Sequence, residues 1–405
     1  MSGFSALDAI DFLLAAIMIG VAGVWVYFLS YMAKSFKCSP RLDDAQKAQS
    51  PHPLVSVILP ARNEERYIAK CLESLLGQDY DNLEIVVIND SSTDGTAGIL
   101  SDYARRDKRI VHVEARPKPP GWAGKNWACI EGYQQSRGEL LLFTDADTVH
   151  SPASISLAVN RLLSDKLDAL SAVPKLVCND FWTRVTLPIL SVFLHTRFSA
   201  LRVNDPKTKT GYFFGSFYII SRRAYEQAGT HSAVRHELVE DGALGARVKE
   251  MGLALKMVRG ERQVSAVWAR DLPSLWHGLR RLMIPLYYQH RRNAVLMTVA
   301  VFFILFEPFV VLPYSAFAHF GLGLEPSAGI LFALNLAAVA LILTTSVAQC
   351  KYGIYEKPAY GLGAPLGGAM VSFGFFSALA DAKKENAVNW RDRQYTVTEQ
   401  QNPLR

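Results

Sequence analysis

The stretch Glu139-Leu-Leu-Leu-Phe-Thr-Asp-Ala-Asp147 joins a short apolar run directly to two carboxylates. Because this run is bounded by Gly138 and by polar residues, it is typical of a strand buried on both faces of a parallel sheet. Ligands of open α/β sheets bind just beyond the carboxyl ends of such strands. Asp145 and Asp147 are therefore expected at a sheet edge where carboxylates can hold a divalent cation, although Asp-x-Asp also occurs by chance in loops.

Predicted strands and helices alternate on both sides of this stretch. Strands are expected at 54–59, 83–88, 109–113, 140–143, 168–173 and 213–221. Helices are expected at about 65–76, 97–106, 125–136, 151–164 and 240–251. Strands that alternate with helices of about 10–15 residues indicate βαβ units and a mostly parallel sheet.

Four acidic positions line up with this order of elements. Glu64, Asp90 and the pair Asp145 and Asp147 each follow a predicted strand, and Asp241 opens a later helix. Because the carboxyl ends of parallel strands share one edge of a sheet, the first three positions are expected to meet in one crevice. Acidic side chains that converge in this way repel one another unless a cation or a hydrogen-bonding ligand lies among them. The pattern therefore indicates a ligand site at this edge.

The apolar residues of the chain are concentrated in a few long segments. With 50% hydrophobic residues, the chain of 405 residues is too apolar for an ordinary soluble enzyme, and its 20% charged residues exclude a purely membrane-embedded protein. Segments that are long enough to cross a hydrocarbon core of about 30 Å as helices are Phe12–Met32, Ala294–Leu324, Pro326–Cys350 and Pro358–Ala380. Buried core helices rarely run so far without polar positions. The sequence predicts one N-terminal and about three C-terminal transmembrane helices.

The basic residues predict how the chain is oriented in the membrane. Residues 1–11 contain no Lys or Arg, whereas Lys34 and Lys37 follow the first apolar segment. By the positive-inside bias, the N-terminus is expected outside and the domain after the first helix in the cytoplasm, at the inner membrane of the cell. The absence of a basic start argues against a cleaved signal peptide. A basic C-terminal tail conflicts with three C-terminal crossings, so either 358–380 is re-entrant or 294–324 crosses twice.

The net charge and the cysteines exclude two other classes of protein. The formal charge of +6 does not require a nucleic-acid partner, because basic residues flank the apolar segments. The five cysteines are scattered and form no Cys-x-x-Cys pair. This arrangement fits reduced thiols and argues against a disulfide framework or a zinc site.

Two further segments combine aromatic and apolar residues with arginines. Residues 181–203, which include Arg184, predict an amphipathic segment on the membrane surface or beneath the acceptor, with an ordinary core helix as the alternative. Residues 272–288 come just before a predicted span and are typical of an interfacial helix. Arg280 and Arg281 in that helix could clamp a phosphate or pair with anionic headgroups.

A series of motifs runs through the predicted α/β region. In chain order it reads Pro60-Ala-Arg-Asn-Glu64, Asn89-Asp-Ser-Ser-Thr-Asp-Gly-Thr96, Gly124-Lys125, Asp145-Ala-Asp147, Gly215-Ser216 and Glu240-Asp241. This series, which covers roughly residues 54–290, resembles the family 2 inverting glycosyltransferases. The resemblance implies a GT-A (nucleotide-diphospho-sugar transferase) fold, which is Rossmann-like. The flanking apolar helices resemble membrane-bound, lipid-directed members such as ceramide, carotenoid and hopene-associated glycosyltransferases.

The resemblance implies a role for each matching residue. Asp90 would bind the nucleotide base, Glu64 the ribose region, and Asp145 the ribose or the metal shell. Asp147 would ligate a Mg²⁺ or Mn²⁺ ion that bridges the diphosphate, and Asp241 would be the general base. Further contacts to the nucleotide sugar, most simply a UDP-sugar, are implied for Ala61, Asn63, Lys125, Gly215, Glu240, Arg280 and Arg281. Lys125 begins a helix, whose N-terminus adds partial positive charge near a diphosphate.

Several polar residues near these motifs have a simpler, structural role as an expectation or as an alternative. Asp94 is expected to be a turn or N-cap residue. His150 is expected to be structural rather than a metal ligand, and His231 and His236 to be surface-loop residues rather than acceptor contacts. The Glu240-Asp241 pair has the alternative of first-turn acids that the helix dipole favours.

The predicted protein is a membrane-bound enzyme with a cytoplasmic catalytic domain. Its parts are expected at 1–33 (N-terminal anchor), 34–53 (linker), 54–271 (catalytic domain), 272–293 (interfacial helix), 294–380 (C-terminal transmembrane region) and 381–405 (basic polar tail). It is expected to move a single sugar from a nucleotide-diphospho-sugar to a hydroxyl or carboxyl group of a membrane lipid or isoprenoid. A polysaccharide or glycan synthase, or a non-catalytic scaffold with this fold, is the alternative. Leu275-Trp-His-Gly-Leu-Arg-Arg281 lacks the Gln-x-x-Arg-Trp motif of processive synthases, which favours single transfer.

Overall fold

The computed structural model describes residues 6–44, 52–382, 387–390 and 393–396, so part of the predicted linker and much of the basic tail lie outside the described residues. The chain divides into two compact units. The one called the helical unit here comprises Met1–Lys37, Cys178–Arg197 and Ala269–Asn386. The one called the sheet unit comprises Cys38–Val177, Phe198–Trp268 and Ala387–Arg405.

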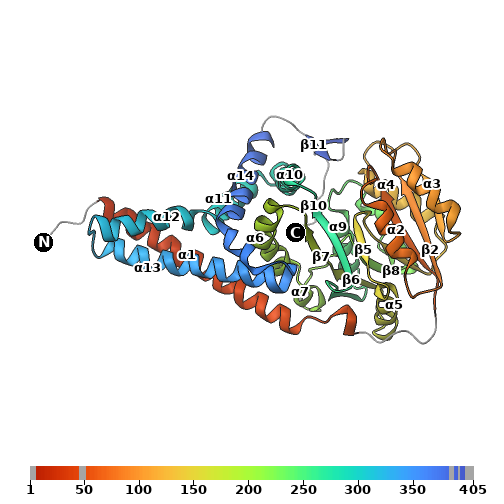
Figure 1. Cartoon of the computed structure of the whole chain (residues 1–405), viewed down its shortest axis with the longest axis horizontal. Helices are drawn as coiled ribbons and strands as arrows, with labels where there is room; N and C mark the ends of the chain where they lie inside the picture. The colour runs from red at the N-terminus through yellow and green to blue at the C-terminus, as the bar shows by residue number, and fades with distance from the viewer. Residues whose placement is uncertain (1–5, 45–51, 383–386, 391–392, 397–405) are drawn as a thin grey trace. The chain divides into compact units, whose positions relative to one another are not determined.

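The sheet unit is built around a seven-stranded sheet with the order β3-β2-β1-β4-β8-β6-β9 (Figure 1). Its strands are β1 (Val55–Ala61), β2 (Leu83–Asn89), β3 (Ile110–Glu114), β4 (Leu140–Phe143), β6 (Ala169–Val173), β8 (Tyr218–Ser221) and β9 (Leu255–Arg259). Strand β1 runs parallel to β2 and β4, β2 runs parallel to β3, and β6 runs parallel to β9. Strand β8 runs antiparallel to both of its neighbours. The predicted mostly parallel sheet is confirmed.

Helices and two small sheets complete this unit. Its α-helices are α2 (Ile68–Leu76), α3 (Thr96–Arg106), α4 (Gly124–Gln135), α5 (Ser154–Ser164), α7 (Ala200–Asn204), α8 (Arg222–Gln227) and α9 (Glu240–Glu250). Its 3-10 turns are η1 (Leu42–Asp44) and η2 (His231–Val234). A three-stranded sheet contains β5 (Thr148–His150), β10 (Val264–Ala269) and β7 (Lys175–Cys178), and β11 (Ala387–Trp390) pairs with β12 (Arg393–Thr396).

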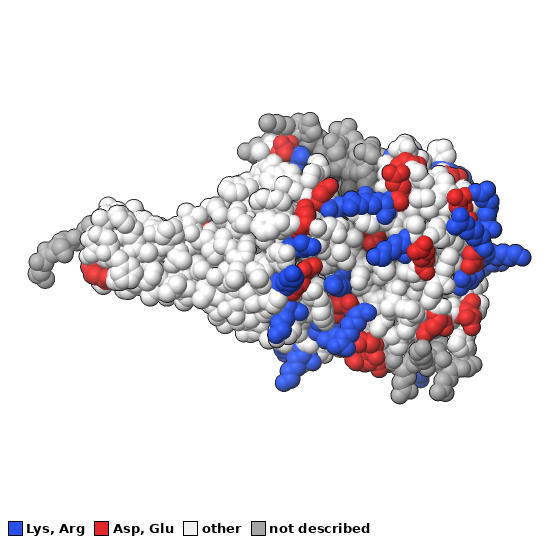
Figure 2. All heavy atoms as spheres, viewed as in Figure 1, with Lys and Arg blue, Asp and Glu red and all other residues white. Residues whose placement is uncertain are grey.

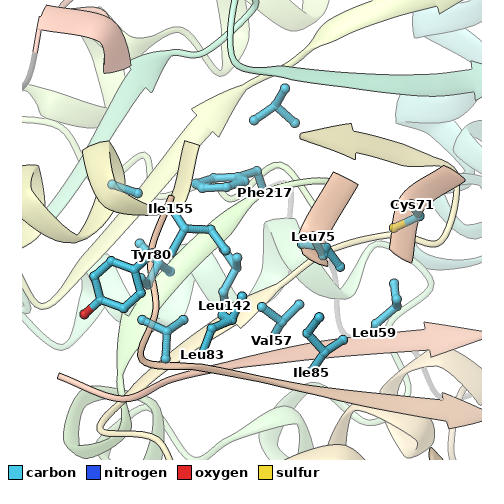
Figure 3. Close-up of a cluster of buried hydrophobic side chains, with 14 of the residues drawn as sticks. Val57, Leu59, Cys71, Leu75, Tyr80, Leu83, Ile85, Leu142, Ile155 and Phe217 are labelled. Carbon is cyan, nitrogen blue, oxygen red and sulfur yellow. The ribbon is translucent and has the colours of Figure 1, made fainter. Parts of the chain in front are cut away.

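The large sheet separates two apolar cores. Val57 and Leu59 of β1 belong to the core drawn in Figure 3, whereas Ile58 between them belongs to the core on the other face. In β4, Leu142 lies in the first core and Phe143 in the second. Because successive side chains of a strand point to opposite faces, a strand that is buried on both faces needs an unbroken apolar run. The apolar run before Asp145 therefore has the structure that the sequence predicts.

The helical unit contains the long apolar helices. Its elements are α1 (Ala6–Cys38), α6 (Phe181–Arg197), α10 (Leu272–Gln289), α11 (Arg291–Leu305), α12 (Glu307–Ala316), η3 (Phe317–Gly321), α13 (Ser327–Gln349), η4 (Cys350–Ile354), η5 (Pro358–Gly363) and α14 (Ala364–Ala382). Among the described residues, Ala6–Cys38, Ser327–Ile354 and Pro358–Ala382 are long and apolar enough to cross a membrane. Figure 2 shows a surface almost free of charged side chains over α12, α13 and the neighbouring part of α1. These helices indicate membrane association.

The predicted C-terminal membrane region is interrupted within the segment 294–324 by a bend between two helices. Helix α11 and the helix that begins at Glu307 qualify as a span only together, and they are bent by 45° at Phe306. Pro308 and Pro313 follow the bend, and a proline removes a backbone donor inside a helix. The pair is a broken span or a re-entrant loop, whereas Pro358–Ala382 is a single long apolar stretch.

Helix α6 packs inside the helical unit. Ten of its residues are buried, and its neighbours include α14 and α13. Its Ser191 Oγ and His195 Nδ1 lie 2.9 Å and 2.7 Å from Nε2 of Gln349 on α13. This burial corresponds to the core-helix alternative for the part of 181–203 that forms α6. The segment Cys178–Arg197 belongs to the helical unit, although the residues before and after it in sequence belong to the sheet unit.

Candidate active site

A buried lysine connects the end of β4 with the start of α9. Lys125 lies in the first turn of α4, and its Nζ is 2.6 Å from Asp145 Oδ1 and 2.6 Å from Glu240 Oε1. Burial alone would lower the pKa of Lys125, but Asp145, Glu240 and Asp241 outweigh it and raise the pKa well above its ordinary value. Lys125 is therefore a fixed cation at the carboxyl edge of the sheet.

Gly215 lies at the centre of these charged groups. Its amide donates to Asp241 Oδ2 over 2.7 Å. A Cβ atom at this position would lie 2.8 Å from Asp241 Oδ2, 3.1 Å from Lys125 Nζ and 3.4 Å from Asp145 Oδ2. Because a side chain would collide with the Asp241 carboxylate, the close approach requires glycine. The structure brings Lys125, Asp145, Gly215, Glu240 and Asp241 together.

The Asp241 carboxylate is held by backbone amides at the start of α9. Besides Gly215, the amide of Gly242 donates to Asp241 Oδ1 over 2.8 Å. Burial and the neighbouring Glu240 raise the pKa of Asp241 to about 7, although Lys125 opposes the shift. A carboxylate with a pKa near neutrality is suited to accept a proton in a reaction at physiological pH.

The ends of β1 and β2 hold the second group of predicted residues. The amide of Asp90 donates to the Ala61 carbonyl oxygen over 2.8 Å, and the amide of Glu64 donates to Thr96 Oγ1 over 2.8 Å. Asn63 has a positive φ of 53°, which asparagine tolerates better than most residues, and its Oδ1 accepts from the Thr93 amide over 2.8 Å. Glu64 and Asp90 are buried. Since β1 pairs in parallel with both β2 and β4, this group lies on the same edge of the sheet as Asp145.

The donor set fits a magnesium-type ion that shares its ligands with a substrate. Asp145 and Asp147 are both half-buried and follow β4. The described residues contain no group of three or more His, Cys, Asp and Glu side chains that could hold a metal ion by themselves. Mg²⁺ is usually bound by one or two carboxylates together with substrate phosphates and water rather than by a protein cage. The two aspartates therefore fit an ion that binds together with a diphosphate.

The segment that contains these residues matches a known family. Residues 56–229 match the family described as Glycosyl transferase family 2. The chain contains a family 2 glycosyltransferase domain.

Similar proteins cover the family 2 domain to different extents. The 4,4'-diaponeurosporenoate glycosyltransferase of Staphylococcus aureus (strain bovine RF122 / ET3-1) is 27% identical over 213 residues, which are 52% of this chain and 55% of that protein. Glycosyltransferase GlyA of Streptococcus pneumoniae is 38% identical over 93 residues, which are 23% of this chain and 13% of that protein. The chain thus spans about half or less of the length of these curated relatives.

One solved structure supports the fold of the whole chain. A mannosyltransferase from Pyrobaculum calidifontis, in complex with GDP-Man and Mn²⁺, superposes with a TM-score of 0.51 and 22% sequence identity. The superposition covers 88% of this chain and 97% of that chain. The predicted fold is confirmed, and residues 56–229 match the predicted family. The roles of single residues in this domain stay predictions.

The histidines near the family 2 site are structural, but one differs from its prediction. His150 is buried, its Nε2 lies 3.1 Å from Thr144 Oγ1, and burial lowers its pKa to about 3. His231 is also buried, although the sequence suggested a surface loop. Its Nδ1 lies 2.7 Å from the Tyr225 hydroxyl, and its ring packs against Phe143. The prediction for His231 is wrong because the nearby Tyr225 and the distant Phe143 together enclose its ring.

The structure also bears on the predictions for Asp94, Arg280 and Arg281. Asp94 accepts from the amides of Thr96 and Glu65 over 3.0 Å and 3.2 Å, which supports a structural role at the start of α3. Arg280 belongs to the helical unit, where it pairs with Asp381 over 2.9 Å. The side chain of Arg281 lies outside the described part of the structure.

Sequence reasoning missed the glycines that shape the start of α9. A Cβ on Gly242 would lie 2.7 Å from Tyr212 Cε2, and a Cβ on Gly245 would lie 2.6 Å from the Phe213 amide nitrogen. The two glycines are three residues apart, so they share one face of the helix. The segment of Tyr212 and Phe213 packs closely against this face of the helix. The spacing of the glycines after Glu240-Asp241 is the sequence signal that could have revealed this contact.

Proposed function

We propose that this protein transfers one sugar from a nucleotide-diphospho-sugar to a hydroxyl group of a membrane lipid or isoprenoid, with inversion at the anomeric carbon. The observation that carries the proposal is the cluster around Gly215, where the Lys125 cation and the Asp241 carboxylate lie within 3.1 Å of one point. A cation is needed for the leaving diphosphate and a base for the attacking hydroxyl, and this cluster contains both.

The nucleotide end of the donor is assigned to the ends of β1 and β2. Asp90 and Glu64 would accept hydrogen bonds from the base and the ribose, and Ala61 and Asn63 would line the same edge. The parallel pairing of β1 with β2 and β4 supports this assignment, because it makes one continuous edge. A UDP-sugar is the first donor to test.

The diphosphate is assigned to the side of the cluster that contains Asp145 and Asp147. These aspartates would hold Mg²⁺ or Mn²⁺, and such an ion supplies charge neutralisation for the leaving diphosphate. Lys125 and the N-terminus of α4 stabilise negative charge at the same place. Lys125 pairs with Asp145 and Glu240 in this structure, so the lysine is already oriented when the donor arrives.

The transfer itself is a single displacement. Asp241 accepts the proton of the acceptor hydroxyl while the hydroxyl oxygen forms a bond to the anomeric carbon. The bond between the anomeric carbon and the diphosphate oxygen breaks, and the nucleoside diphosphate leaves with the electron pair. The amides of Gly215 and Gly242 keep the Asp241 carboxylate oriented for this proton transfer.

The relatives and the helical unit support the choice of acceptor and location. The staphylococcal relative is a 4,4'-diaponeurosporenoate glycosyltransferase, and the solved mannosyltransferase is in complex with GDP-Man and Mn²⁺. Apolar helices of membrane-spanning length support a location in the membrane, where lipid acceptors are dissolved. We further propose that the protein lies in the inner membrane with its N-terminus outside and the family 2 domain in the cytoplasm.

The test uses the purified full-length protein. It is incubated with a panel of UDP- and GDP-sugars, Mn²⁺ or Mg²⁺, and a total lipid extract, and nucleoside diphosphate release and labelled lipid are measured. We expect release and transfer from one donor, with products of single-sugar size rather than polymer. Asp241→Asn should abolish transfer, whereas Asp102→Asn on α3 should not. The proposal would be overturned if no donor gave nucleoside diphosphate release or sugar transfer.

A further inference from the structure

Three half-buried aromatic rings lie beside the family 2 site. Tyr212 and Phe214 belong to the segment that leads into Gly215, and Phe198 packs against Tyr212. Phe198 and Tyr212 are stacked, with ring centroids 4.1 Å apart, and Tyr212 meets Phe214 edge to face at 5.3 Å. These three residues are called the aromatic shelf below.

Two of the shelf residues lie against the second apolar core of the sheet unit. Phe213 is fully buried and stacks on Tyr218 with the ring centroids 4.5 Å apart. Tyr212 and Phe214, on either side of Phe213 in sequence, pack against the same core but are only half-buried. These two rings are therefore supported by the core and keep part of their surface exposed.

The shelf is fixed against the helix that begins with Asp241. Gly242 leaves room for the Tyr212 ring, since a Cβ there would lie 2.7 Å from Tyr212 Cε2. Phe214 is adjacent in sequence to Gly215, whose amide donates to the Asp241 carboxylate. Both edges of the shelf thus adjoin the residue that would take the acceptor proton.

From this arrangement we infer that the aromatic shelf is the acceptor subsite, and that it binds the apolar body of an isoprenoid or acyl-chain alcohol. The inference rests on the proposed function and names the substrate contact of that same site. Aromatic rings bury large apolar area and are usual in sites for ligands with an apolar body and one polar end. The same chain has apolar helices that are long enough to cross a membrane, in which such alcohols dissolve. Phe198 directly follows α6 in the chain, and α6 packs with those helices.

A binding experiment tests the shelf without relying on turnover. Full-length protein in lipid nanodiscs is irradiated with a long-chain isoprenoid alcohol that carries a diazirine next to its hydroxyl end, and the labelled peptides are mapped by mass spectrometry. We expect label within residues 198–214, reduced by Tyr212→Ala and retained by Tyr212→Phe. Tyr103→Ala on α3 is the matched control, because Tyr103 is also half-buried and lies away from Gly215.

Kinetics provide the second readout. Tyr212→Ala and Phe198→Ala are expected to lower kcat/KM for the lipid acceptor about tenfold while donor hydrolysis by water and the KM for the donor stay unchanged. An equal loss of hydrolysis and transfer would indicate a structural role and overturn the inference. Label confined to the membrane helices, or protection of the shelf by a soluble sugar but not by the unlabelled alcohol, would also overturn it. If the protein neither hydrolysed the donor nor transferred its sugar, the proposed function would be refuted instead. The labelling experiment would then still show whether the aromatic shelf binds the alcohol.

Discussion

At the residue scale, the site depends on Gly215, which has no Cβ atom. Gly215 leaves the space in which its amide, the Asp241 carboxylate and the Lys125 ammonium approach one another. The sequence indicated the importance of Asp241 and Lys125 by their place in a motif series. Only the structure shows that a glycine lies between them and that a methyl group would separate them.

Gly215→Ala is therefore expected to impair catalysis more than stability. The added methyl group would lie 2.8 Å from Asp241 Oδ2, and a displacement of about 1 Å in an active site can cost about 100-fold in rate. Steady-state kinetics and thermal unfolding of the purified variant measure the two effects. Gly98→Ala is the control, because a Cβ there meets nothing within 4 Å. Unchanged kcat/KM in Gly215→Ala would contradict the assigned geometry.

The pH dependence of transfer follows from Asp241. Its pKa is raised to about 7 by burial and by Glu240, and a base acts only in its ionised form. The value of kcat/KM should therefore rise with pH up to about 7 and level off above it. A pH profile of the wild-type enzyme measures this, with donor hydrolysis profiled in parallel. A flat profile from about pH 5.5 to 8 would exclude Asp241 as the general base.

At the element scale, α14 organises the helical unit through its glycines. A Cβ on Gly367 would overlap the Val185 carbonyl oxygen of α6, and a Cβ on Gly374 would lie 2.8 Å from Leu279 Cδ1 of α10. Small residues allow helix backbones to approach closely in membrane proteins. This packing explains why α6 is a buried helix, which the arginines of the segment 181–203 did not suggest.

Gly367→Ala is expected to destabilise the helical unit. Overpacking of a close helix contact costs about 1–3 kcal/mol, so the thermal unfolding midpoint of the detergent-solubilised protein should fall. Gly20→Ala on α1 provides the comparison, because a Cβ there meets nothing within 4 Å. Equal midpoints for the two variants would refute the close packing of α6 and α14.

At the scale of the whole molecule, the described chain combines a GT-A sheet unit with apolar helices of membrane-spanning length. Cys38 ends α1 and is exposed, whereas the other four cysteines are buried. This difference makes Cys38 a reporter of orientation.

The proposed topology predicts that Cys38 faces the cytoplasm. In intact spheroplasts a membrane-impermeant maleimide should not label Cys38, and labelling should appear after permeabilisation. In a Cys38→Ser background, Ala6→Cys at the start of α1 should be labelled in intact spheroplasts, because residue 6 is exposed. The reverse pattern of labelling would place the N-terminus inside.

The sequence by itself determined the alternation of strands and helices from β1 to β4, the long apolar segments and the acids that follow the strands, but it missed β5, β7, β9 and β10. These features are local, because a doubly buried strand needs an unbroken apolar run and a span needs a long one. The tertiary structure alone decided that His231 is buried, that α6 is packed, and that Phe198, Tyr212 and Phe214 form a shelf beside Asp241. Each of these depends on contacts between different segments, such as His231 with Phe143 and α6 with α13, and no periodicity within one segment encodes such contacts.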